Sequence, residues 1–456
     1  MLNHLHFVDS GRGGRRPLTF SRYAGIGSHR YPVGFSGDTH TTWASLDFQP
    51  YFTATAANVG YGWWSHDVGG HRLGSHDVER TVRWVQLGVF SPVNRLHSSN
   101  SPFATKEPWA FGPRAQAVVE RFLRLRHLLV PTLYSASWTA HTDGVAIVRP
   151  MYHDHPRTQE AFEVPNQAMV GEHLLLAPIT TPEDQVATIA SVRAWLPPGA
   201  WVDLFTGARY GTDDAGPHDG RGRHVVLHRP LEGYPVLVRA GAVLPLAADP
   251  MADVREAPEV LVLRVVPGTA SSTLVEDDGG AAPVPEVTVM RQRVVGAGDG
   301  GATIELEIEA TTGRPVGRPR EIWVDLVGVA SVDEVTIDVG GEGSAGPAAA
   351  PMVVGPADDD AAELLAPALR ISLGRVDTAL GLTLTVTGVR AAPRDVVDDA
   401  FTLLAAAEIP YATKENAWAA VKRLGGIDLA QELAALDLPE VLRAALLEVA
   451  ATDPVL

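Results

Sequence analysis

The sequence of 456 residues contains no cysteine, which excludes disulfide bonds and thiolate metal sites. Positive charge is scarce, because 37 Lys and Arg stand against 54 Asp and Glu and give a formal net charge of -17. A surface of this sign repels phosphate backbones and anionic membranes, so we expect neither as a partner. The sequence has no run of about 18 apolar residues and no signal-like start, and we expect a cytoplasmic chain.

The periodicity of the apolar residues changes three times along the chain. Residues 1–142 combine short apolar runs, Gly-rich loops and helical stretches, which is typical of an α/β unit. Residues 143–246 and 247–390 hold strand-like runs between Pro and Gly turns, and each segment predicts a β-sandwich domain. Residues 391–456 are rich in Ala and Leu and predict a short helical tail.

Two local predictions are specific enough to check. Apolar residues recur at three- and four-residue intervals between Gly112 and Ala140 and predict a helix, which Pro131 kinks or ends. The stretch from Gly340 to Pro356 is rich in Gly, Ala and Pro and predicts a flexible loop or linker.

Polar and aromatic residues are densest between residues 22 and 97. They fall in three segments, Phe35 to Asp38, Trp63 to His71 and Arg95 to His97, which we expect to form strand-end loops around one cleft. Aspartates on Gly-containing loops beside Trp suit sugar binding, since aromatic faces cover the apolar side of a pyranose and carboxylates, Arg and His bind its hydroxyls.

The same residues allow other interpretations. The side chains of His66, Asp67, His71, His76 and Asp77 are of types that bind zinc or manganese, but their spacing fits no standard site. We therefore expect no metal and no cofactor. Asp38 could be an Asx turn or a helix N-cap, and one of Trp63 and Trp64 is expected to pack in the core because successive strand residues face opposite ways.

Several segments in order resemble glycoside hydrolase family 31. They are Ser21 to Asp38, Gly60 to Gly74, Arg83 to Pro92 with Arg95-Leu96-His97, and Leu196 to Gly207, and the resemblance covers roughly residues 1–280. It implies the C-terminal half of a (β/α)8 barrel followed by two β-sandwich domains and the tail. It also implies a retaining glycosidase similar to α-glucosidases and α-xylosidases, which hydrolyses O-glycosyl bonds of an α-linked oligosaccharide or glycoside.

Carried over residue by residue, the resemblance implies that Asp38 is the general acid/base. It also implies that Arg22, Asp67 and His97 bind the sugar, with Phe35 and Trp64 beside it. The chain departs from the family in having Phe35 where many relatives have Trp. It also has His71 where they often have an aromatic residue.

The family's nucleophile is a second carboxyl, in a Trp-x-Asp motif upstream of a segment that resembles Leu2 to Phe7. Trp201-Val202-Asp203 has these letters but falls in the predicted β-sandwich. We therefore expect this chain to lack the nucleophile, and to be a homo-oligomer or to miss an N-terminal half. The alternative is a non-catalytic carbohydrate-binding remnant or one half of a split enzyme.

Overall fold

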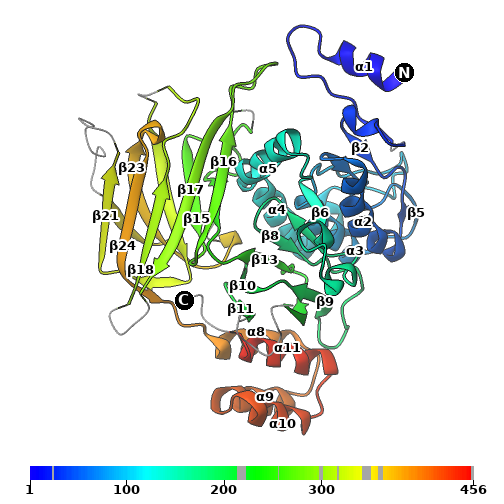
Figure 1. Cartoon of the computed structure of the whole chain (residues 1–456). Coiled ribbons are helices and arrows are strands. Elements are labelled where there is room, and N and C mark those ends of the chain that lie inside the picture. Colours follow the sequence, from blue (N-terminus) through cyan, green and yellow to red (C-terminus); the bar gives the residue numbers. More distant parts are fainter. Residues whose placement is uncertain are drawn as a thin grey trace.

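The computed structural model describes residues 1–22, 25–212, 222–254, 256–296, 301–315, 318–340, 351–357 and 363–452. Helices and short parallel strands come first, antiparallel sheets follow, and helices close the described part of the chain (Figure 1). Within these residues, no helix has both the length and the apolar character that crossing a bilayer requires.

Three very short strands form a parallel sheet in the order β1-β2-β4. Their bounds are Ser21–Arg22, Gly34–Phe35 and Trp64–Ser65. The parallel pairing continues through single bridges from Ser65 to Val93 and from Val68 to Leu96. Because these strands all run the same way, the residues that follow them lie at one edge of the sheet.

The parallel strands alternate with helices. These are α2 (Trp43–Thr55) after β2, α3 (Val78–Val89) after β4, and α4 (Pro113–Leu128) with α5 (Val130–Thr142) after residue 93. The predicted helix between residues 112 and 140 is confirmed as α4 and α5. Pro131 lies in the first turn of α5, where its missing N–H leaves no hydrogen bond unmade, so the proline starts a new helix.

The next segment forms a six-stranded antiparallel sheet in the order β11-β10-β13-β8-β7-β6. Its strands are β6 (Val148–Pro150), β7 (Ala168–Val170), β8 (Leu174–Leu176), β10 (Gly199–Asp203), β11 (Arg209–Thr212) and β13 (Val236–Arg239). A separate antiparallel pair joins β9 (Ala190–Leu196) to β12 (Arg223–Arg229).

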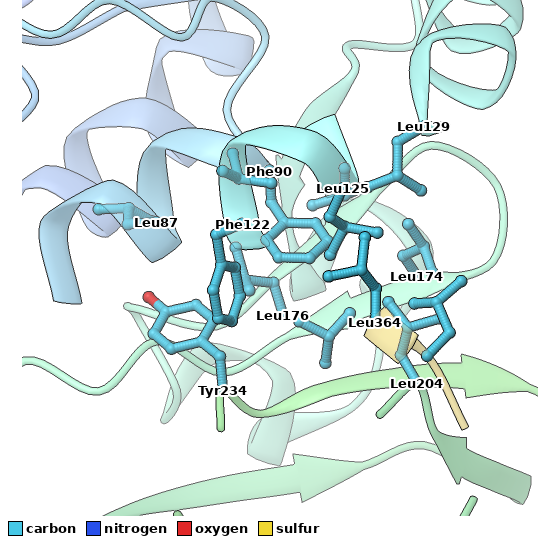
Figure 2. Packing of buried hydrophobic residues seen from close by; sticks show 14 of the residues in the cluster. Leu87, Phe90, Phe122, Leu125, Leu129, Leu174, Leu176, Leu204, Tyr234 and Leu364 are labelled. Carbon is cyan, nitrogen blue, oxygen red and sulfur yellow. The ribbon is translucent and has the colours of Figure 1, made fainter. Parts of the chain in front are cut away.

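The helices and this first antiparallel sheet share one hydrophobic core (Figure 2). Phe90, Phe122 and Leu125 from the α3 and α4 region meet Leu176 of β8 and Tyr234, which precedes β13. The junction is also polar, because the buried Arg83 of α3 donates to the carbonyls of Gly233 at 2.9 Å and Arg229 at 3.2 Å. The helical region is therefore held against the sheet by packing and by hydrogen bonds.

Two further sheets face each other around a second core. The first has the order β14-β15-β19-β23-β22. Its strands are β14 (Val243–Ala247), β15 (Val260–Val265), β19 (Arg320–Val327), β23 (Ala368–Val376) and β22 (Met352–Pro356). The second has the order β16-β17-β18-β24-β20, and β21 also pairs with β24. Its strands are β16 (Ala270–Glu276), β17 (Glu286–Val295), β18 (Ala302–Ile308), β24 (Leu382–Ala391), β20 (Val329–Ser331) and β21 (Glu334–Val339).

The predicted linker between residues 340 and 356 is wrong at its C-terminal end. β22 (Met352–Pro356) pairs with β23 in an antiparallel register, because three consecutive apolar residues, Met352 to Val354, complete the sheet edge. Residues 341–350 of that prediction lie outside the described residues.

The final helices are α8 (Val396–Ala406), α9 (Tyr411–Arg423), α10 (Gly426–Ala434) and α11 (Glu440–Ala450). They enclose a small core of their own. α11 lies along β12, where the Glu448 carboxylate accepts hydrogen bonds from Tyr210 Oη at 2.6 Å, His228 Nδ1 at 2.7 Å and Arg229 Nη1 at 2.9 Å. A buried carboxylate thus attaches these helices to β11 of the first antiparallel sheet and to β12 of the separate pair.

The first helix, α1 (Leu2–Ser10), has no buried residue. The segment after it is attached through Arg16, whose guanidinium donates to Asp277 Oδ1 and to Tyr134 Oη, both at 2.6 Å. Burial raises the pKa of Asp277, but hydrogen bonds from Tyr134 and Arg16 outweigh it and lower the pKa. Asp277 Oδ1 also accepts from Gly279 N.

Candidate functional site

Asp38 and Arg22 meet at the edge where the parallel strands end. Arg22 is the last residue of β1, and Asp38 follows β2 by three residues. Arg22 Nη2 lies 2.9 Å from Asp38 Oδ1, and both side chains are partly exposed to solvent. The carboxyl is thus held from one side by a guanidinium and remains accessible from the other.

Gly37 sets the distance between these two groups. Its φ is +84°, and a Cβ at this position would lie 3.0 Å from Arg22 Nη1. We expect Gly37→Ala to displace the guanidinium and to cost about 1 kcal/mol of backbone strain. In the protein that supplies both carboxyls, the expected result is a rise in KM with a small fall in stability, measured by steady-state kinetics and thermal unfolding. Unchanged kinetics would show that the pair does not contact the substrate. Gly279→Ala is the matched control, since it has φ +73° and no atom within 4 Å of its Cβ.

Phe35 forms an aromatic surface beside the pair. Its ring stacks on Phe20 with centroids 4.9 Å apart, and the guanidinium carbons of Arg22 and Arg95 lie 5.9 and 5.5 Å from its centroid. Phe20 was not foreseen from the sequence. Its signal is only its place one residue before a strand, and it is 45% exposed.

Asp67 is fully buried and does not present a free carboxylate. One oxygen pairs with Arg95, and the other accepts from the backbone N–H of Thr39 at 3.4 Å. Arg95 in turn lies over the Phe20 ring at 5.1 Å. Asp67 therefore fixes Arg95 and the loop that carries Asp38, as well as lining the same cluster.

His97 and His71 stack on each other, with ring centroids 4.7 Å apart and planes 19° apart. His71 Nε2 also lies 3.8 Å from Asp38 Oδ2, which connects the histidine pair to the carboxyl. Burial lowers the pKa of His97, and Arg95 lowers it further against the opposing effect of Asp67. At neutral pH the His97 ring is therefore neutral and can both donate and accept a hydrogen bond.

Trp64 is buried beside two other aromatic rings. Its side chain is 2% exposed and packs between Phe52 and Tyr61, with ring centroids 5.1 and 5.2 Å away. Trp63 is only partly buried, against the main core. Of the two tryptophans, Trp64 is thus the one packed in the interior.

The five residues considered as metal ligands are not brought together. The buried ring of His66 bonds Ser91 Oγ at 2.8 Å and Trp84 Nε1 at 3.1 Å, and burial lowers its pKa to about 3. His76 stacks on Phe111, and Asp77 is the N-cap of α3. These three side chains are occupied by the fold.

Asp67, His71 and His97 do place one potential ligand atom each within 4.8 Å of one another. However, both Asp67 oxygens already accept hydrogen bonds, and the lone pairs of the two imidazoles lie in stacked, nearly parallel ring planes, which do not meet at one ion between them. The arrangement fits hydrogen bonding to a polyhydroxylated molecule better than tetrahedral coordination.

Asp203 of the Trp-x-Asp sequence is structural. It is fully buried, Oδ1 accepts from the backbone N–H of Phe205 and Thr206 at 2.8 and 2.9 Å, and Oδ2 pairs with Arg229 at 2.6 Å. It lies at the end of β10, in a different sheet from the Asp38 cluster.

Comparison with known families gives two matches. Residues 3–136 match the family model described as the glycosyl hydrolases family 31 TIM-barrel domain, and residues 144–244 match the one described as the glycosyl hydrolase family 31 C-terminal domain. Together they span the Asp38 cluster and the first antiparallel sheet.

Among curated proteins, the chain is 32% identical over 268 residues to an alpha-xylosidase of Saccharolobus solfataricus, covering 58% of this chain and 34% of the relative. It is 29% identical over 273 residues to alpha-glucosidase 2 of Bacillus thermoamyloliquefaciens, covering 58% and 32%. The chain therefore spans about a third of the length of these relatives.

Among solved structures, a GH31 dextranase of Flavobacterium johnsoniae complexed with isomaltotriose superposes with a TM-score of 0.69. The match covers 85% of this chain and 48% of that one at 21% identity, and so concerns the fold alone.

Proposed function

The chain belongs to glycoside hydrolase family 31, and from this membership we propose that it supplies the acid/base side of a retaining α-glycosidase active site. The reaction is the hydrolysis of O-glycosyl bonds in an α-linked oligosaccharide or glycoside, as the names of its α-xylosidase and α-glucosidase relatives suggest. Asp38 is the general acid/base, and Arg22, Phe35 and His97 hold the sugar, while Asp67, expected from the sequence to bind it, is buried and instead positions Arg95.

One observation carries the proposal. Asp38, Arg22, Phe35, Asp67 and His97 are joined by an unbroken series of contacts through Arg95 and His71, at the edge where parallel strands end. Such an edge is where (β/α)8 enzymes place their active sites. Trp64 is left out of this set because it packs in the interior.

The geometry fits the first proton transfer. Arg22 holds one Asp38 oxygen, so the other is free to give a proton to the departing glycosidic oxygen and later to take one from water. The retaining mechanism also needs an ionised carboxylate about 5–5.5 Å away to attack the anomeric carbon. We assign that nucleophile to a Trp-x-Asp segment outside this chain, because Asp203 is buried beside Arg229.

The architecture leaves room for that segment. Among the described residues β1 pairs only with β2, and Leu18, Phe20 and Ile26 beside it are exposed. An open parallel edge with apolar neighbours is a template for more strands. In this proposal residues 1–142 are about half of a barrel, residues 143–246 and 247–390 are two β-sandwich domains, and residues 391–456 are a tail. The location is cytoplasmic.

The alternative is a carbohydrate-binding remnant or one half of a split enzyme. The open edge of β1 favours the split form, and the stack of the exposed Phe20 on the half-buried Phe35 favours binding without turnover.

A fluorosugar experiment separates these functions. A 5-fluoro-α-glycosyl fluoride slows the hydrolysis of the glycosyl-enzyme, so peptide mass spectrometry can locate the ester in the native protein. We expect the label on an aspartate outside the 456 residues, together with release of an α-configured sugar seen by NMR. A label on Asp38 or Asp203 would contradict the assignment. Saccharide binding with no label and no product would favour the remnant.

A further inference from the structure

A half-open cavity lies away from the Asp38 cluster. It has a volume of about 450 Å³ and lies between α5, the turn from β7 to β8, and strands β14, β16 and β17. α5 runs beside β16 in this part of the molecule (Figure 1). No residue of the Asp38 cluster lines it, and its size is within the range of about 300–1,000 Å³ typical of small-molecule sites.

The wall of the cavity combines apolar and polar side chains. Trp138 of α5 and the aliphatic side chains of Val243, Leu244 and Val287 are its apolar members. Glu172 and Asp143 contribute carboxylates, and both residues are exposed. The cavity therefore offers an aromatic ring together with hydrogen-bond acceptors.

The positive groups that line the cavity are already occupied. Each of the three guanidinium nitrogens of Arg149 donates a hydrogen bond, two to Asp154 at 2.8 Å and one to the Gly171 carbonyl at 2.7 Å. His173 bonds Ser272 Oγ at 2.9 Å, and burial lowers its pKa to about 4, so it is neutral at pH 7. An anionic ligand would thus meet two carboxylates and find no unoccupied cation.

From this chemistry we infer that the cavity is a second, non-catalytic binding site for a neutral saccharide of one or two residues. Sugar hydroxyls donate to Glu172 and Asp143, and the apolar face of the pyranose packs on the Trp138 ring. The choice of a saccharide rests on the proposed function, whereas the existence of the site rests on the cavity itself.

Methyl NMR on protein labelled at Val and Leu tests the inference directly. Val243, Leu244 and Val287 report on the cavity, and Leu96 reports on the Asp38 cluster through its neighbour His97. Maltose, isomaltose and xylose are the probes. We expect concentration-dependent shifts of the three cavity methyls, and an affinity about tenfold weaker in Trp138→Ala.

Two variants complete the test. Glu172→Gln keeps the shape of the wall, and should weaken binding by removing a charged acceptor. Tyr411→Ala removes an aromatic side chain that is 82% exposed on α9, and should leave the titration unchanged. The wild-type and Trp138→Ala spectra without sugar show whether the variant is folded.

The possible results distinguish the second site from the proposed function. Absence of cavity shifts with all three sugars, equal shifts in Trp138→Ala, or shifts produced only by a cation such as choline would overturn the inference. Shifts of Leu96 without cavity shifts would leave the proposed function intact and remove only the second site. Cavity shifts without Leu96 shifts would support the second site and contradict saccharide binding at the Asp38 cluster.

Discussion

Asp38→Asn is expected to lower kcat/KM for an α-linked disaccharide by about 10²–10⁴-fold in the protein that supplies both carboxyls. The amide cannot give a proton to the departing sugar oxygen, although it keeps the shape of the side chain and its place beside Arg22. The loss should be much smaller for a 4-nitrophenyl glycoside, because that leaving group departs without protonation. Steady-state kinetics on the two substrates gives the comparison.

The matched control is Asp338→Asn, which removes one carboxylate from an exposed position on β21, in a sheet remote from the cluster. Its kinetics should equal those of the wild type. A uniform loss on both substrates for Asp38→Asn would instead assign Asp38 to sugar binding, and no loss on either would remove it from the mechanism.

Glu448→Gln is expected to lower the free energy of unfolding by about 3 kcal/mol, because breaking a buried ion pair leaves its partner charge uncompensated. Glu448 is the shared acceptor for Tyr210, His228 and Arg229, and Arg229 then keeps only Asp203 as a charged partner. Chemical denaturation measures the change. Hydrogen exchange should show faster exchange in α8 to α11 than in β15 to β24.

The same carboxylate gives the fold an acid sensitivity with a definite sign. Despite its burial, the charge of Arg229 and the hydrogen bonds lower the pKa of Glu448 to about 2, from an ordinary value of 4.5. A depressed carboxyl pKa contributes stability above the unfolded value and loses it as pH falls through the folded one. Between about pH 5 and pH 2 the wild type should thus lose stability that the Gln variant does not have.

Glu440→Gln provides the comparison, since Glu440 is an exposed residue of the same helix. It should change the unfolding free energy by less than about 0.5 kcal/mol. Equal effects of Glu440→Gln and Glu448→Gln would mean that the network around Arg229 does not stabilise the attachment of α11.

The residue patterns predict much of the fold where one face of an element is consistently apolar. The helical period between residues 112 and 140 matches α4 and α5, and the Ala- and Leu-rich tail matches α8 to α11. The patterns miss strands such as β17, because the polar Gln292 occupies a buried position where the alternation requires an apolar residue. Its neighbours Arg291 and Arg293 fit the exposed positions and make cross-strand pairs with Glu309 and Glu305. Such pairs depend on a partner strand that local periodicity does not contain.

Residue types indicate the site less fully than the resemblance does. The family motif and the position after a strand together predict Asp38 and Arg22. The role of Arg95 instead depends on its pairing with the buried Asp67, 28 residues earlier in the chain. Arg83, in the most distinctive matching segment, binds the carbonyl of Gly233 and so supports the fold rather than the sugar. Asp203 shows why letters alone are insufficient, because the Trp-x-Asp sequence recurs at the end of a sheet strand, where the carboxylate binds Arg229.

The attachment of α11 also constrains the order in which the chain can mature on the ribosome. Glu448 is 220 residues beyond His228 and 219 beyond Arg229, so neither side chain can meet this partner until residue 448 has been synthesised. Tyr210 and His228 must remain hydrated or pair elsewhere during that interval, while the intervening sheets, whose pairings are more local, can already form. The strand β12 is thus translated about 220 residues before the carboxylate that completes its contacts.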